Sequence, residues 1–221
     1  PQRRVVAYDR RANSRSGRPP SQPGVTGLAE QADDARAVLD RLGIERAAVL
    51  GTSGGGCIAL ELARRHPQRV ERLLLHEPAL VHALPDGAQL HAALSEQLRA
   101  NSAERGPEAA LEAFLRFAYG DEPWELLPAA VARRILANGA VFVEQEFEAL
   151  TSARPPAPGE WLPRAVLLRG TASPPFLTPL CERVADVLAA PVRIVPGGHL
   201  GYFTHPGPFA QALLTATEEN R

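Results

Sequence analysis

The stretch VLGTSGGGCIALELA, residues 49–63, constrains the fold more than any other part of the chain. It passes from an apolar segment through a glycine-rich turn into a pattern typical of a helix. One serine, Ser53, lies at the tip of the turn, with glycines at positions 51, 54, 55 and 56. Two kinds of site use such a strand-to-helix turn: a backbone cradle for phosphate and a presented nucleophile.

A phosphate cradle does not fit these residues. A Walker loop requires a lysine after its glycines, and the sequence contains no lysine, so all 24 basic residues are arginine. The dinucleotide pattern G-x-G-x-x-G fails as well, because the glycines of residues 51–56 do not fall at its offsets. We therefore favour the nucleophile.

Residues 51–55 match the G-x-S-x-G pattern of a nucleophile presented between a strand and a helix. The turn holds the serine in a strained conformation, and small residues at positions 51 and 55 let it approach the neighbouring strand and helix. The N–H group of Gly54 lies where the helix begins, and unpaired amides and the helix dipole favour an oxyanion there. The pattern predicts a nucleophile at Ser53 and an oxyanion donor at Gly54.

Short apolar segments alternate with helical patterns along the chain. A helix with an apolar face is predicted from Leu28 to Leu42, with Gly43 as its stop, and another follows Ser53 up to His66. This alternation predicts an α/β fold, with a mostly parallel sheet and helices on both faces. The predicted strands are residues 4–8, 47–51, 70–76, 165–169 and 192–195.

One segment breaks this rhythm and predicts a helical lid before the last two strands. We expect four helices and no strand between about residues 84 and 150, followed by the proline-rich linker RPPAPGEWLP. The predicted organisation is a first core part (1–83), a lid with its linker (84–163) and a second core part (164–221). Ligands bind at the carboxyl ends of the strands in open α/β sheets, so a few lid aromatics should face an apolar pocket there.

A serine hydroxyl needs a base to take its proton, and His199 is the strongest candidate. It follows the last predicted strand in RIVPGGHLGYFTHP, on a Gly-Gly loop that frees its ring to reach over the sheet. His205, just before a proline, is expected to be structural, and His76 is a minor candidate for a pocket role. The order nucleophile, lid, late histidine is that of an α/β-hydrolase.

These residues together resemble the α/β-hydrolase superfamily, closest to its lid-bearing, cofactor-free, esterase-like bacterial members. The resemblance implies that Ser53 is the nucleophile and His199 the general base. It covers the sheet along the whole chain, whereas the lid matches only as a helical insertion. The matching segments are VVAYDRRANSRSG (5–17), GTSGGG (51–56), LLLHEPAL (73–80), VLLRGTASPPF (166–176) and PGGHLGYFTHP (196–206).

The third member expected of such a triad is not where the family usually places it. The loop after residues 165–169 reads GTASPPFL and contains no carboxylate, and Ala172 occupies the usual position of the acid. In some relatives the acid lies instead at the end of the preceding strand, which here is Glu77 in HEP. Glu77 is therefore the candidate acid, with a purely structural glutamate as the alternative.

The second departure concerns the N-terminus. The sequence begins with proline and contains no methionine. In the family a second oxyanion donor comes from a loop after an earlier strand, and that loop would lie upstream of residue 1. We therefore expect additional N-terminal residues carrying at least two more strands, unless residues 4–8 pair directly with residues 47–51.

Composition narrows the classes of partner. The formal net charge is −1, so nothing favours nucleic acid or an anionic membrane. No apolar run approaches the ~20 residues of a membrane span, and a cytoplasmic protein with buried Cys57 and Cys181 thiols is expected. We expect no metal and no cofactor, and oligomeric state stays open.

Three functional hypotheses follow. The leading one is a serine hydrolase that cleaves a small apolar ester or thioester. The alternatives are a catalytically silent ligand-binding protein that has lost its acid, and another cofactor-free reaction in the same pocket, such as carbon–carbon bond hydrolysis or a perhydrolase-like activity.

Overall fold

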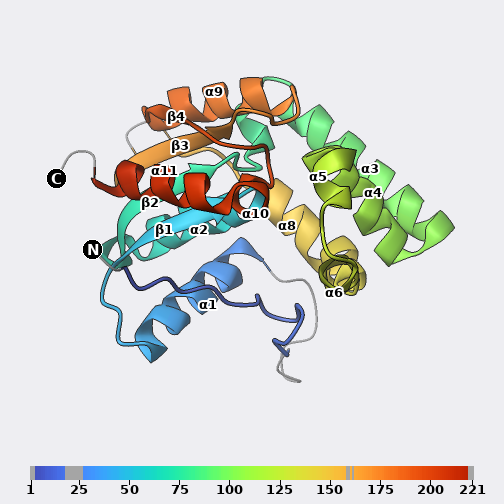
Figure 1. The fold of residues 1–221 in the computed structure, drawn as a ribbon, viewed down its shortest axis with the longest axis horizontal. Helices are drawn as coiled ribbons and strands as arrows, with labels where there is room; N and C mark the ends of the chain where they lie inside the picture. Colours follow the sequence, from blue (N-terminus) through green and yellow to red (C-terminus); the bar gives the residue numbers. More distant parts are fainter. Residues whose placement is uncertain (1–2, 18–26, 158–159, 161, 219–221) are drawn as a thin grey trace.

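The computed structural model describes residues 3–17, 27–157, 160 and 162–218. Its strands form a parallel sheet in the order β1-β2-β3-β4, so each strand pairs with its neighbour in sequence (Figure 1). This arrangement confirms the predicted α/β fold class. The strands are β1 (Ala47–Thr52), β2 (Val70–His76), β3 (Ala165–Gly170) and β4 (Val192–Val195).

Helices cover both faces of the sheet, as the continuous apolar strands predicted. On β2, Leu73 and Leu75 pack into one core cluster, whereas Leu74 packs into a second cluster on the opposite face. The first cluster is covered by α1 (Leu28–Arg41), α2 (Gly54–Arg65) and α9 (Leu177–Leu188), and the second by α11 (Pro206–Glu218). A short helix, α10 (Gly201–Thr204), precedes α11.

The helix and cysteine predictions for the core hold. Helix α1 ends at Arg41, and Gly43 follows with a φ of +63°, a conformation that suits glycine at a helix stop. Cys57 on α2 and Cys181 on α9 are free and buried, as expected, and burial raises the pKa of each thiol to about 12. None of the described helices is long and apolar enough to cross a membrane.

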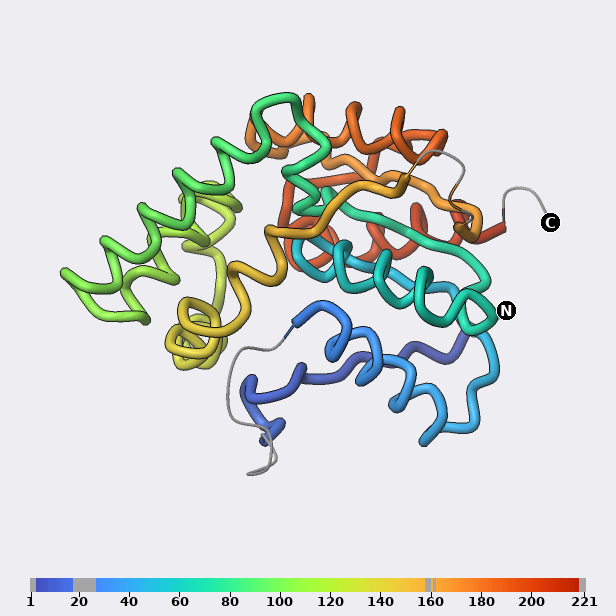
Figure 2. The backbone as a smooth tube through the Cα atoms, turned by 180° about the vertical axis from the view of Figure 1, so that it is seen from behind, coloured from blue at the N-terminus to red at the C-terminus, as the bar shows by residue number. Residues whose placement is uncertain are grey.

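The predicted strand at residues 4–8 is wrong. These residues form no strand and do not pair with β1, which pairs with β2 alone among the described strands. They run instead beside α1 (Figure 2), where the Arg4 side chain donates to the Leu42 carbonyl and Val5 is 88% exposed. An apolar extended sequence becomes a strand only when a neighbour completes its ladder of hydrogen bonds, and sequence alone does not supply that neighbour.

Between β2 and β3 the chain leaves the sheet and forms the helical insertion, residues 87–151, which lies to one side of the core (Figures 1 and 2). It contains more elements than the four predicted helices, because glycine and proline at 106–107 and glycine at 120 divide it. Residues 158, 159 and 161 of the predicted linker lie outside the described residues. The elements are α3 (Gly87–Arg105), α4 (Pro107–Tyr119), α5 (Asp121–Glu125), α6 (Ala129–Leu136), α7 (Gly139–Val141), a π-helical turn (Phe142–Glu146) and α8 (Phe147–Thr151).

Candidate active site

Ser53 lies at the tip of the turn between β1 and α2, in the strained conformation that the sequence predicted. Its φ is 53° and its ψ is −125°, which is unusual for a residue with a side chain. Backbone hydrogen bonds hold it there: its N–H donates to the His76 carbonyl at 3.0 Å, and its carbonyl accepts from Gly56 and Ala79. A strained residue that its surroundings fix in this way is a feature of functional sites.

Glycine is required on both sides of Ser53. One of the two expected positions, Gly51, is confirmed, and the other, Gly55, is replaced by Gly56. A Cβ at Gly51 would lie 2.4 Å from the Gly55 carbonyl oxygen, as predicted for that position. A Cβ at Gly55, in contrast, would meet nothing within 4 Å, whereas one at Gly56 would lie 2.6 Å from the side chain of Pro78. The close approach of the helix, to the segment that follows β2, therefore occurs one residue later than the pattern indicated.

His199 and Glu77 meet across the carboxyl ends of the strands. The Nδ1 atom of His199, in the loop after β4, lies 2.6 Å from Oε2 of Glu77, which follows β2. Both side chains are buried. An ionised carboxylate only accepts hydrogen bonds, so Nδ1 carries a proton, and in the neutral imidazole Nε2 is then the nitrogen with a free lone pair. Glu77 has a φ of +45°, which is a strained backbone conformation. Like Ser53, it is the first residue after a strand.

The end of β3 and the loop after it bind Glu77, and this loop supplies no acid of its own. Oε1 of Glu77 accepts from the Gly170 N–H at 2.9 Å and from the Ser173 hydroxyl. Ala172 sits in this loop, and its N–H donates to the Gly197 carbonyl two residues before His199. The sequence signal for Ser173 was present, since a hydroxyl residue follows the usual acid position directly, but we did not predict it.

These contacts decide the charge of Glu77. Burial acts to raise the pKa of the carboxyl, but the hydrogen bonds with His199 and Ser173 outweigh it and hold the pKa below 4.5. Glu77 is therefore a carboxylate at neutral pH.

His76, the minor candidate, lies beside this pair without joining it. Its ring is stacked on His199 with centroids 5.9 Å apart, and it contacts Phe209 edge-on. Burial lowers its pKa to about 4, although the charge of Glu77 acts in the opposite sense. His76 is therefore neutral, and His199 is the histidine that is hydrogen-bonded to Glu77. His205 ends α10, with Nδ1 2.9 Å from the Thr204 hydroxyl, and so fits its expected structural role.

Ser53, Gly54 and His199 line one pocket of about 350 Å³. Its apolar wall comes from the helical insertion, and three aromatics of the insertion line the pocket, Phe114, Tyr119 and Phe142. We define the apolar wall as Leu111, Phe114, Leu115, Ile135, Phe142 and Leu150.

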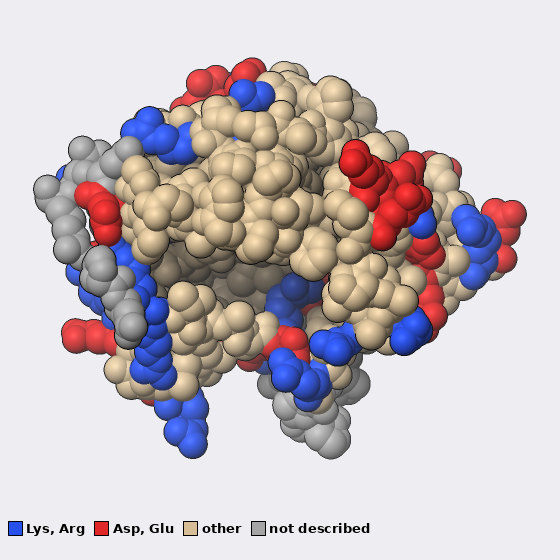
Figure 3. Space-filling view, viewed as in Figure 1, with Lys and Arg blue, Asp and Glu red and all other residues tan. Residues whose placement is uncertain are grey.

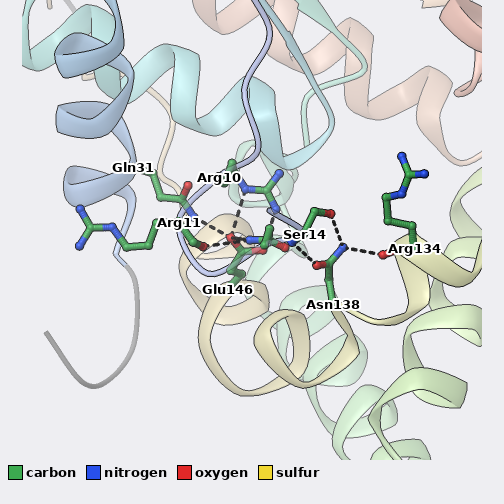
Figure 4. Close-up of polar contacts among 8 residues, drawn as sticks. Arg10, Arg11, Ser14, Gln31, Arg134, Asn138 and Glu146 are labelled. Atoms are coloured by element: carbon green, nitrogen blue, oxygen red, sulfur yellow. Dashed lines mark hydrogen bonds and ion pairs between the residues drawn. The ribbon is translucent and has the colours of Figure 1, made fainter. Parts of the chain in front are cut away.

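A second wall of the same pocket is polar and was not predicted. It forms where the N-terminal segment, residues 3–17, meets the insertion. Basic and acidic side chains lie side by side on the surface in this region (Figure 3). Within it Glu146 is bonded to Arg10, and the Ser14 N–H donates to Asn138 (Figure 4). The polar wall comprises Asp9, Arg10, Asn13, Ser14, Asn138 and Glu146.

Comparison with known proteins supports the fold assignment. The model of the α/β-hydrolase fold family matches residues 1–206. An uncharacterized hydrolase of Bacillus subtilis, YraK, is 29% identical over 98% of this chain and 80% of its own length.

Two solved structures are similar in fold. A hydrolase from Pseudomonas aeruginosa has a TM-score of 0.71 at 24% identity, covering 96% of this chain and 78% of its own. A thermophilic esterase from Thermogutta terrifontis has the same TM-score at 20% identity, covering 95% and 77%. Strand order, the serine turn and the family match agree, and the chain belongs to the α/β-hydrolase fold family.

Proposed function

We propose that this protein is a serine hydrolase that cleaves a carboxylic ester or thioester through an acyl-enzyme. The Ser53 hydroxyl attacks the carbonyl carbon while His199 Nε2 takes its proton and then gives it to the departing alcohol or thiol. Water, activated by the same imidazole, then releases the carboxylic acid and restores Ser53. The helical insertion acts as a lid over this site.

The observation that carries the proposal is the 2.6 Å contact between His199 Nδ1 and Glu77 Oε2. It fixes the imidazole with Nε2 as the proton acceptor and supplies a negative charge that stabilises the imidazolium formed during attack. The rival hypothesis of a silent protein rested on the missing acid in the loop after β3. Glu77, which lies one strand away, fills that role.

Gly54 is the proposed oxyanion donor. It is the first residue of α2, a helix of 12 residues, so its N–H lies among the unpaired amides of a helix N-terminus. A negative oxygen that develops on the substrate carbonyl next to Ser53 is stabilised by this N–H and by the helix dipole.

The apolar wall indicates a substrate with an apolar portion, and the esterase among the similar structures supports an ester bond. A pocket of about 350 Å³ is at the lower end of the size range for small-molecule sites. We therefore propose a short acyl group.

Labelling with a fluorophosphonate probe tests the proposal. The wild-type protein should form one adduct, mapped by mass spectrometry to Ser53, and Ser53→Ala should form none. Cys57→Ser is a matched control on the same helix, and it should label at the wild-type rate. Labelling of another serine would overturn the assignment of Ser53, and slow labelling equal to that of free serine would leave the ligand-binding alternative.

A further inference from the structure

The polar wall contains a carboxylate that the proposed chemistry does not use. Glu146 ends the π-helical turn Phe142–Glu146 of the insertion, and its side chain is 1% exposed. A carboxylate withdrawn from water is costly unless it is paired and hydrogen-bonded, and π-helical turns occur often at functional sites. The question is what this buried charge holds in place.

Four donors converge on Glu146 from two other parts of the chain (Figure 4). Arg10 binds it with two hydrogen bonds, from Nε at 3.1 Å and from Nη2 at 2.6 Å. Asn13 and Gln31 donate their side-chain amides to Oε1, each at 2.9 Å. The guanidinium of Arg10 is therefore held in one orientation by a planar, two-point contact.

This orientation leaves one edge of Arg10 free of Glu146. The ion pair uses Nε and Nη2, so the two N–H groups of Nη1 point away from the carboxylate. The Arg10 side chain is 33% exposed and lines the pocket. Burial raises the pKa of the Tyr119 hydroxyl, and the charge of Arg10 opposes this, so the cation is within electrostatic reach of Tyr119. The Tyr119 ring in turn lies 5.6 Å from His199.

In the polar wall each carboxylate is paired with an arginine. Its second carboxylate, Asp9, is bonded to Arg15 at 2.7 Å, and the positive charge of Arg134 also helps to lower the Asp9 pKa. Arg10 is therefore the arginine that lines the pocket, while Arg15 and Arg134 compensate the charge of Asp9 from outside the pocket lining. Arg11 is directed elsewhere, toward Asp34 and Glu30 of α1.

We propose that Arg10 is the specificity-determining residue of this site and binds a carboxylate carried by the acyl part of the substrate, with Glu146 as the residue that positions Arg10. The inference rests on the proposed ester hydrolysis and deepens it. The substrate class becomes the half-ester of a short dicarboxylic acid, whose methylenes contact the apolar wall.

Two esters of nearly the same shape test this substrate class. Monoethyl succinate carries a carboxylate at the far end of its acyl group, and ethyl levulinate carries a neutral methyl ketone there. The wild-type protein should prefer monoethyl succinate in kcat/KM by about 10- to 100-fold, the range expected of hydrogen bonds to a charged group.

The double variant Arg10→Gln/Glu146→Gln removes the ion pair without leaving one charge buried alone. It should abolish the preference for monoethyl succinate, chiefly through a higher KM for that ester. The matched control Arg64→Gln/Glu160→Gln removes an ion pair with a 2.8 Å contact outside the pocket and should keep the preference. Arg10→Lys, which retains the charge without the planar fork, should restore part of it. An equal loss for both esters in the double variant would reduce Arg10 to a structural role and overturn the inference.

Binding of succinate to Ser53→Ala, measured by calorimetry, separates this inference from the proposed function. If neither ester is hydrolysed but succinate binding is lost in the Arg10→Gln/Glu146→Gln background, the hydrolase proposal fails and the carboxylate site stands. If both esters are hydrolysed without preference and succinate does not bind, the hydrolase proposal stands and the carboxylate site fails.

Discussion

Two buried glutamates, Glu77 beside the sheet and Glu146 in the helical insertion, solve the same electrostatic problem with different partners. Each is at most 1% exposed, and each accepts several hydrogen bonds. The partner of Glu77 is a histidine, whose imidazole can accept and release a proton. The charged partner of Glu146 is an arginine, which stays protonated. A carboxylate paired with histidine can serve proton transfer, whereas one paired with arginine can only hold a cation in position.

The structural elements that hold the two glutamates also differ. Glu77 lies directly after a central strand, and it is held by the Gly170 N–H and the Ser173 hydroxyl. Glu146 lies on a π-helical turn and joins the insertion to the N-terminal segment and α1. The sheet therefore carries the groups of the proposed reaction, and the contact between segments shapes the pocket.

The largest expected effect is the loss of the Glu77 charge. Glu77→Gln should lower kcat by about 10³- to 10⁴-fold, as the equivalent change of a triad acid does in a serine protease, because the imidazolium loses its charged partner. Glu146→Gln should lower kcat less than tenfold and instead raise the KM for monoethyl succinate. Steady-state kinetics measure both, with circular dichroism to verify folding. Similar losses of kcat in the two variants would erase the distinction between the glutamates.

The next effect is a pH dependence of stability that originates beside Glu77. The pKa of His76 is lowered from 6.5 to about 4 by burial, so between these values the unfolded chain binds a proton that the folded protein does not. Stability from this group is complete above pH 6.5 and falls as the pH drops toward 4. The loss amounts to about 3 kcal/mol, from a pKa difference of roughly two and a half units.

Urea unfolding at pH 7 and pH 4.5 measures this loss. His76→Phe keeps the contact with Phe209 and should remove most of the pH dependence over that range. Glu77 also contributes to stability, because its pKa is lowered in the folded protein. This contribution is present above pH 4.5 and is lost only as the pH falls through the lowered pKa, so it should remain in the variant. An unchanged pH dependence in His76→Phe would contradict the assignment to His76.

Features that depend on residues close together in the sequence were predicted, whereas features that depend on residues far apart in the sequence were not. Local patterns predicted the turn at Ser53, the helix α1 and four of the strands, because glycine spacing and apolar periodicity act over a few residues. Residues 4–8 have the composition of a strand but lack a ladder partner, which is a property of the whole sheet.

The two glutamates show the same limit. Glu77 was predicted as a candidate because a resemblance pointed to the end of its strand, while its hydrogen bond to Ser173 depends on a loop 96 residues away. Glu146 carried no signal, since its bonds to Arg10 and Gln31 span 136 and 115 residues. From sequence alone, a polar residue in a helical pattern is predicted to be solvent-exposed, because the distant residues that bond to it are known only from the fold.

The smallest effect compares the neutral donors that support each glutamate. Ser173→Ala removes one hydroxyl from Glu77, and Gln31→Leu removes one amide from Glu146, and other donors remain on both carboxylates. Each change should lower the free energy of unfolding by about 1 kcal/mol, the typical value of one buried hydrogen bond. Only Ser173→Ala should also lower kcat, by about five- to tenfold, because it weakens the hold on the carboxylate that orients His199. Denaturant titration and kinetics with ethyl levulinate measure the two quantities on the same samples. If Gln31→Leu lowers kcat as much as Ser173→Ala does, then Glu146 acts on the reacting groups, and the division between a reacting glutamate and a positioning glutamate fails.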